Sequence, residues 1–116
     1  VNDWDYFLLE YRSTPDSGYG FNPLFVCDGI VVYHVNEQQV FGTGNFAAPP
    51  SLEVIPADHT ITAATGVQCN DLFAPGSGHQ TLPREVVNPL DSEVAFRIQD
   101  VSSSSAGELS ITIALP

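Results

Sequence analysis

The sequence contains no lysine and no methionine, and its 116 residues include only two cysteines and one tryptophan. Three arginines stand against fourteen acidic residues, which gives a formal net charge of −11. A surface of that sign repels the phosphates of nucleic acids and of anionic lipids. No apolar run approaches the roughly 20 residues that a membrane-spanning helix needs. The sequence therefore predicts no nucleic acid and no membrane among its partners.

What is present is typical of one folded domain. Hydrophobic residues make up 43% of the chain and charged residues 15%, and a chain of this length can bury a core without metals. No signal segment opens the sequence, so it is expected to begin inside a longer product. The acidic balance suits solubility outside the cell or in a salty medium. The alternative interpretation is that some of the acids gather to bind calcium.

The two cysteines, Cys27 and Cys69, predict a single disulfide formed in an oxidising compartment. Closing that loop of about 40 residues would stabilise the fold by roughly 4 kcal/mol on a chain-entropy estimate. Two small buried side chains that behave as hydrophobes are the alternative.

Strand patterns dominate, and no stretch has helical periodicity. Residues 5–12 and 29–36 carry apolar side chains on both alternating faces, which is typical of strands covered on both sides. A weaker strand is expected over 52–55. Apolar and polar residues alternate over 94–101 and again over 108–115, around a short Ser/Gly turn, which predicts an antiparallel hairpin.

Between residues 60 and 89 the pattern fades, and an irregular connection is expected there. The predicted fold class is all-β, as a small antiparallel β-sandwich or a curved sheet. The segment 6–11 is apolar on both faces, yet few strands are available to cover it. We therefore expect an exposed apolar patch beside 6–11 and 30–35, larger than the roughly few hundred Å² of a typical monomer, with Val31 among its outward residues.

Four segments resemble, in order, the signature of the immune inhibitor A family of secreted zinc metallopeptidases. The strand 6–12 (YFLLEYR) is followed by 28–37 (DGIVVYHVNE), then by LEVIPAD and DLFAPG at 52–58 and 71–76. The closing hairpin lies where the family pattern ends. Asn36 replaces the family's frequent Asp, and Ala74 is inserted before the Pro-Gly turn.

Members of that family place a His-Glu-x-x-His helix upstream, where two histidines hold zinc and the glutamate activates water. The histidines present here, His34, His59 and His79, form no such pair. The resemblance therefore implies that residues 1–116 are a single β domain, the C-terminal part of a secreted metallopeptidase-like protein. Its partner would be the upstream catalytic module, and zinc would belong to that module, with no cofactor in this chain.

Glu10, Arg12 and His34 are candidates for supporting the cleft of that peptidase. Glu10 and Arg12 lie two apart on one strand face, where they can pair. Glu10 is also expected to face His34 from an adjacent strand. The alternative for His34 is structural, because it shares a strand face with Ile30 and Val32 and would be a core histidine bonded to a neighbour.

Asp58, Asn70 and Asp71, together with Glu53, can supply oxygen ligands to calcium, although their spacing is not that of a dedicated calcium loop. The predicted function is a non-catalytic β segment that completes or supports the catalytic module and its substrate cleft. A free-standing extracellular binding module for carbohydrate or protein is the alternative.

Overall fold

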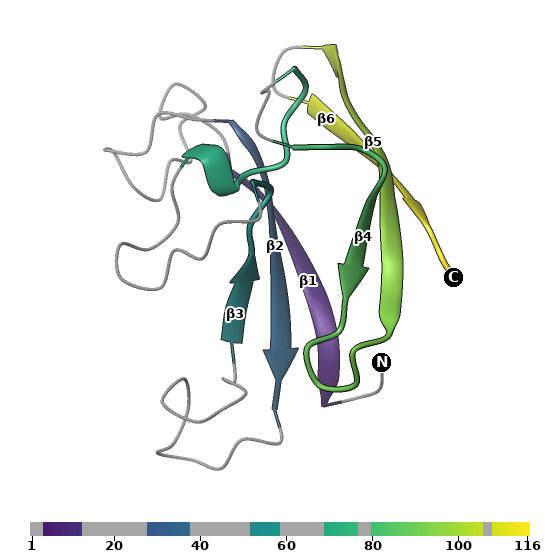
Figure 1. The fold of residues 1–116 in the computed structure, drawn as a ribbon. Helices are drawn as coiled ribbons and strands as arrows, with labels where there is room; N and C mark the ends of the chain where they lie inside the picture. The colour runs from purple at the N-terminus through teal and green to yellow at the C-terminus, as the bar shows by residue number, and fades with distance from the viewer. Residues whose placement is uncertain (1–3, 13–27, 38–51, 59–68, 77–79, 106–107) are drawn as a thin grey trace.

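The computed structural model describes residues 4–12, 28–37, 52–58, 69–76, 80–105 and 108–116. Within these ranges the chain forms six strands, which make two three-stranded antiparallel sheets (Figure 1). Sheet A has the order β1-β2-β3 and sheet B the order β4-β5-β6. The elements are β1 (Asp5–Arg12), β2 (Gly29–Asn36), β3 (Leu52–Ile55), the 3-10 turn η3 (Cys69–Asp71), β4 (Arg84–Val87), β5 (Val94–Ser105) and β6 (Glu108–Ala114).

The predicted all-β class is confirmed. The described residues include no helix long and apolar enough to cross a membrane.

Sheet A is built around β2, in which Ile30, Val31 and Val32 are buried and Val35 is partly exposed. Val32 pairs with Leu9 of β1 on one side and with Ile55 of β3 on the other. The two-sided apolar pattern of β1 predicts the same burial, but β1 lies at the edge of its sheet, and Leu8 is 50% exposed. The prediction of two covered faces is therefore right for residues 30–32 of β2 and wrong for β1.

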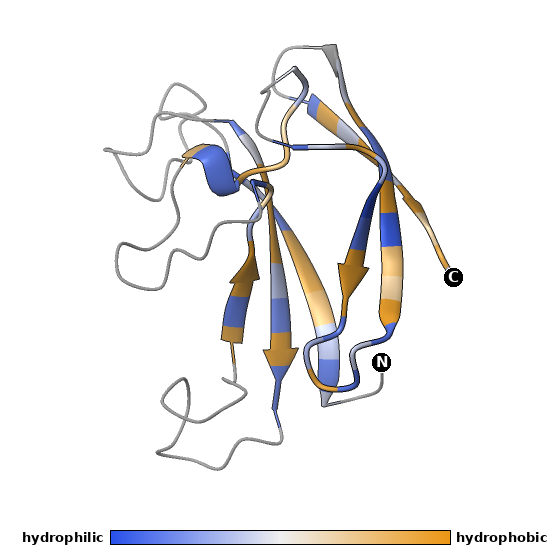
Figure 2. Cartoon of the chain, in the orientation of Figure 1, coloured by the Kyte–Doolittle hydropathy of each residue, from blue (hydrophilic) through white to orange (hydrophobic). Residues whose placement is uncertain are grey.

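Sheet B contains the predicted hairpin. Strand β5 pairs with β6 from Arg97 opposite Ala114 to Ser105 opposite Glu108, so β5 extends four residues past the predicted end at Val101. Figure 2 shows apolar and polar residues alternating along β5. Strand β4 was not predicted, because its four residues fall between Pro83 and Pro89, which read as turn signals.

The core lies between the two sheets. The ring of Phe7 in β1 meets that of Phe96 in β5 edge to face, with centroids 5.2 Å apart. The buried apolar residues of this core are Ile30, Val32, Ala57, Phe73, Val86, Phe96, Ile98 and Val101. The structure is thus a small β-sandwich, in agreement with the sequence.

The segment that follows η3 completes sheet A beyond the end of β3. Ile30 and Phe73 exchange two backbone hydrogen bonds, each of 2.9 Å. Leu72 lies against Gly29 so closely that a Cβ there would come within 2.6 Å of the Cβ of Leu72. A residue larger than glycine would therefore displace this segment from β2.

The structure describes only one of the two cysteines of the predicted disulfide. Cys69, in η3, is held in a disulfide. The predicted partner, Cys27, lies outside the described ranges. The Cys27–Cys69 bridge therefore stays a prediction.

Candidate functional site

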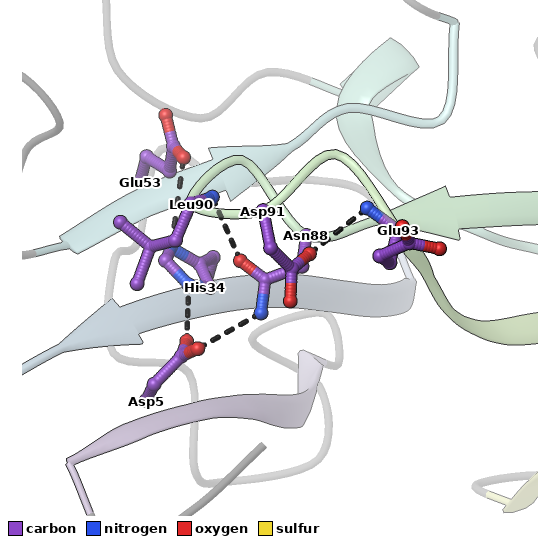
Figure 3. Close-up of polar contacts among 7 residues, drawn as sticks. All are labelled: Asp5, His34, Glu53, Asn88, Leu90, Asp91 and Glu93. Atoms are coloured by element: carbon purple, nitrogen blue, oxygen red, sulfur yellow. Dashed lines mark hydrogen bonds and ion pairs between the residues drawn. The ribbon is translucent and has the colours of Figure 1, made fainter.

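The most unusual group in the core is a buried histidine between acidic side chains. His34, in β2, has no exposed surface, and its Nε2 lies 2.7 Å from Oδ1 of Asp5 (Figure 3). Residue 34 pairs with Phe7, so Asp5 is its diagonal neighbour on the same face of sheet A. That face is the one that packs on sheet B, because Phe7 contacts Phe96.

Asn88 connects this histidine pair to the second sheet. It follows β4, and its Nδ2 donates a hydrogen bond of 2.9 Å to Oδ2 of Asp5. Its own Oδ1 accepts from the backbone N–H of Leu90, which fixes the orientation of the amide. Asp5 and Asn88 are 83 residues apart in sequence, so this bond ties the start of sheet A to the turn between β4 and β5.

These contacts also fix the state of Asp5. Burial alone would raise the pKa of this carboxyl, but the hydrogen bonds from Asn88 and His34 outweigh burial and hold the pKa below its ordinary value. A carboxylate only accepts hydrogen bonds, so Nε2 of His34 must carry the hydrogen that points at Asp5. The remaining ring nitrogen, Nδ1, is then turned toward β3.

Glu53 of β3 lies directly opposite His34 in the strand register. Its Oε1 is 3.6 Å from Nδ1 of His34, which is longer than a hydrogen bond. Both atoms are buried, and neither has a hydrogen-bond partner among the described residues. The Glu53 side chain as a whole is 31% exposed, so the cluster opens toward solvent on this side.

A second polar group occupies the opposite face of sheet A. Arg12 Nε donates to Glu10 Oε1 at 2.9 Å, and the Tyr33 hydroxyl donates to the same oxygen at 2.8 Å. Arg12 Nη2 donates to the Tyr33 oxygen at 2.9 Å, which closes the triangle. Burial would raise the pKa of Glu10, but the hydrogen bonds from Arg12 and Tyr33 outweigh it and lower that pKa.

The structure therefore joins two of the three predicted cleft-supporting residues and separates the third. Glu10 and Arg12 pair as expected. The expected contact between Glu10 and His34 is wrong, because Glu10 stands opposite Val31 in the register, on the other face of the sheet from His34.

The predicted calcium ligands are only partly assembled. Asn70 Nδ2 donates to Asp58 Oδ2 at 2.7 Å, so the amide nitrogen faces the carboxylate. Asp71 is fully buried at the end of η3, and its backbone oxygen accepts from the N–H of Ala57. Across the described ranges, no group of three or more His, Cys, Asp or Glu side chains is placed to hold a metal ion. Calcium binding by these residues stays a prediction.

The sequence does not predict Asp5 or Asn88 as site residues, and it places Glu53 among the calcium ligands and not beside His34. Asp5 stands just ahead of an apolar run, and Asn88-Pro89 reads as a turn. No local pattern indicates that two polar residues so distant in sequence will meet.

Apolar side chains crowd the outer face of sheet A. The register places six of them there in two rows across the three strands, and we refer to them as the outer apolar face: Tyr6, Val35 and Leu52, and next to them Leu8, Tyr33 and Val54. Leu8 is 50% and Leu52 44% exposed, and the other four are partly exposed. Exposed apolar side chains are therefore present on this face, but the expectation for Val31 is wrong, since that residue has no exposed surface.

Comparison with protein-family models, with characterised proteins and with solved structures finds no match for this chain.

Proposed function

We propose that this chain is a non-catalytic β-sandwich segment of a secreted, zinc-metallopeptidase-like protein. Its task is to support the catalytic module and the substrate cleft of that protein. The observation that carries the proposal is the outer apolar face, which lies on the two strands of the family resemblance and on the strand beside them.

The exposure of this face sets it apart from the surface of an ordinary sandwich. A free-standing sandwich leaves the outer face of each sheet polar. Here two leucines in neighbouring rows are about half exposed, with aromatic and β-branched side chains between them. Exposed large apolar side chains that neighbour one another on a sheet face mark a surface that contacts another protein.

The residues next to this face agree with such a contact. The Tyr6 hydroxyl donates to Glu37 Oε1 at 2.6 Å, and the Glu10–Arg12–Tyr33 triangle lies on the same side of the sheet. An apolar centre with a polar rim is the usual anatomy of a protein interface. In this proposal Glu10 and Arg12 act by shaping the docking face, and His34 acts from within the core.

The test compares two exposed leucines in the intact parent protein. Leu8→Asp places a charge on the outer apolar face, whereas Leu115→Asp places the same charge at the 79%-exposed leucine after β6. We expect Leu8→Asp to reduce zinc-dependent peptidase activity at least about tenfold, since a charge buried in an interface costs more than 1.4 kcal/mol. Leu115→Asp should leave the activity unchanged. Equal activity of the two variants would remove the support for this function.

The alternative module, which binds carbohydrate or protein on its own, is separated by the same pair of variants. Such a module would bind its ligand as an isolated chain, and Leu8→Asp would then change ligand binding without any effect on peptidase activity.

A further inference from the structure

We propose that Nδ1 of His34 and Oε1 of Glu53 together bind a divalent transition-metal ion. This inference is independent of the proposed function, since it rests only on the cluster inside the sandwich. It begins from two buried acceptor atoms that face each other.

The tautomer of His34 decides which of its ring nitrogens can bind a metal ion. Asp5 receives hydrogen bonds from both Asn88 and the Nε2 of His34, so the ring hydrogen lies on Nε2. In the neutral ring Nδ1 then carries a lone pair, and it points at a carboxylate oxygen that also carries lone pairs. Two acceptors in contact repel each other unless a cation lies between them.

The distance between Nδ1 of His34 and Oε1 of Glu53 also favours a bound ion. At 3.6 Å the two atoms are too far apart for a direct hydrogen bond. With metal–ligand bonds of about 2.0–2.2 Å to nitrogen and oxygen, an ion that touches both atoms would subtend an angle of roughly 120°. That angle is close to the one that tetrahedral and trigonal sites require, so the spacing suits a shared ion better than a shared hydrogen.

The ring of His34 is also held from behind. A metal-binding histidine almost always donates its other N–H to a carboxylate, which fixes the ring and raises its basicity. Asp5 occupies that position, and Asn88 holds Asp5 from the second sheet. An imidazole nitrogen with one carboxylate oxygen is a donor set suited to Zn²⁺ and similar ions.

The protein supplies two donors in this arrangement, and the Glu53 side chain is 31% exposed, so the remaining positions would be filled by water from that side. A site with two protein ligands is weaker than a closed structural site with four. We therefore expect reversible binding that a chelator removes without unfolding the chain.

The experiment uses the chelator-treated chain and zinc chloride alone at neutral pH. Calorimetry should show one bound ion, and nitrogen NMR of the histidine rings should show a shift at Nδ1 of His34 on saturation. Glu53→Gln should weaken binding at least about tenfold, and Asp5→Asn, which acts through the ring, by about 10–100-fold. The double variant His59→Gln/His79→Gln serves as the control and should keep the full affinity.

Two results would overturn the proposal. One is a Glu53→Gln chain that binds zinc as tightly as the unchanged chain. The other, which needs no variant, is an Nδ1 resonance of His34 that keeps its hydrogen at saturating zinc, because a proton would then be the cation between the two side chains.

Discussion

Each face of sheet A departs in one respect from the usual distribution of polar and apolar groups. The inner face buries Asp5 and His34 against sheet B, whereas the outer face leaves Leu8 and Leu52 about half exposed. An isolated sandwich keeps charged groups outside and large apolar groups inside. On the inner face the buried carboxylate of Asp5 is satisfied from within the chain, since Asn88 reaches it from the other sheet. On the outer face Leu8 and Leu52 stay about half exposed, and this is therefore where we expect another protein surface.

The largest effect on stability is expected at Val31, a residue of the outer face of sheet A that is fully buried. Val31 lies on the same side of the sheet as Leu8 but has no exposed surface, so Val31→Asp buries an unpaired charge. We expect a loss of about 4 kcal/mol or more in the free energy of unfolding, against less than about 1 kcal/mol for Leu8→Asp. Denaturant unfolding of the two variants measures both values. Similar losses for the two variants would contradict the difference in burial between Val31 and Leu8.

The next largest effect concerns the inner face. Asp5→Ala removes the carboxylate that accepts hydrogen bonds from His34 Nε2 and Asn88 Nδ2. These two buried donors then lose their acceptor. Breaking a buried pair of this kind costs about 3–5 kcal/mol. The exposed acid Asp100 of β5 provides the control, and Asp100→Ala should change the free energy of unfolding by less than about 0.5 kcal/mol. If Asp5→Ala unfolds at the same denaturant concentration as the control, the cluster does not hold the sheets together.

A smaller effect should appear as a dependence on pH. The folded-state pKa of Asp5 is lowered, so its contribution to stability is complete above the unfolded-state pKa of about 3.9 and is lost as the pH falls through the folded-state value. Asp5→Asn cannot ionise and lacks this contribution. The gap in unfolding free energy between the two proteins should therefore be widest near neutral pH and should narrow below about pH 4. A gap that stays constant down to pH 2 would contradict the lowered pKa.

The smallest effect is expected from the polar triangle on the outer face. Glu10 and Arg12 keep 37% and 27% of their side-chain surface, so solvent screens their attraction. Glu10→Gln should cost less than about 1 kcal/mol, and the cost should shrink as salt is added. A loss as large as that of Asp5→Ala would show that this triangle, and not the buried cluster, is the stronger polar group of sheet A.

The sequence predicted the parts that follow from local alternation. The β5–β6 hairpin is predicted because its apolar residues repeat with period two, and β1 and β2 are predicted because their runs of apolar, β-branched and aromatic residues are typical of strands. Alternation does not tell which strand will be central, so β1 was expected to be covered on both sides. Strand β4 was hidden by the prolines around it.

The candidate site depended on information that the sequence does not carry locally. Glu10 and Arg12 pair because they are two apart on one strand. Whether Glu10 or Phe7 faces His34 depends on the register between strands, and a shift of one residue exchanges the two faces. The contact of Asp5 with Asn88 needs the complete sandwich, since it joins the first strand to the turn after the fourth.

The proposed function requires that, in a parent protein, another module covers the outer apolar face. Hydroxyl-radical footprinting measures this directly, because it reports the solvent exposure of individual side chains in the isolated chain and in the parent protein. We predict that Leu8 and Leu52 lose most of their reactivity in the parent protein, while Leu115 keeps its own. Equal reactivity of Leu8 and Leu52 in the two samples would contradict the account.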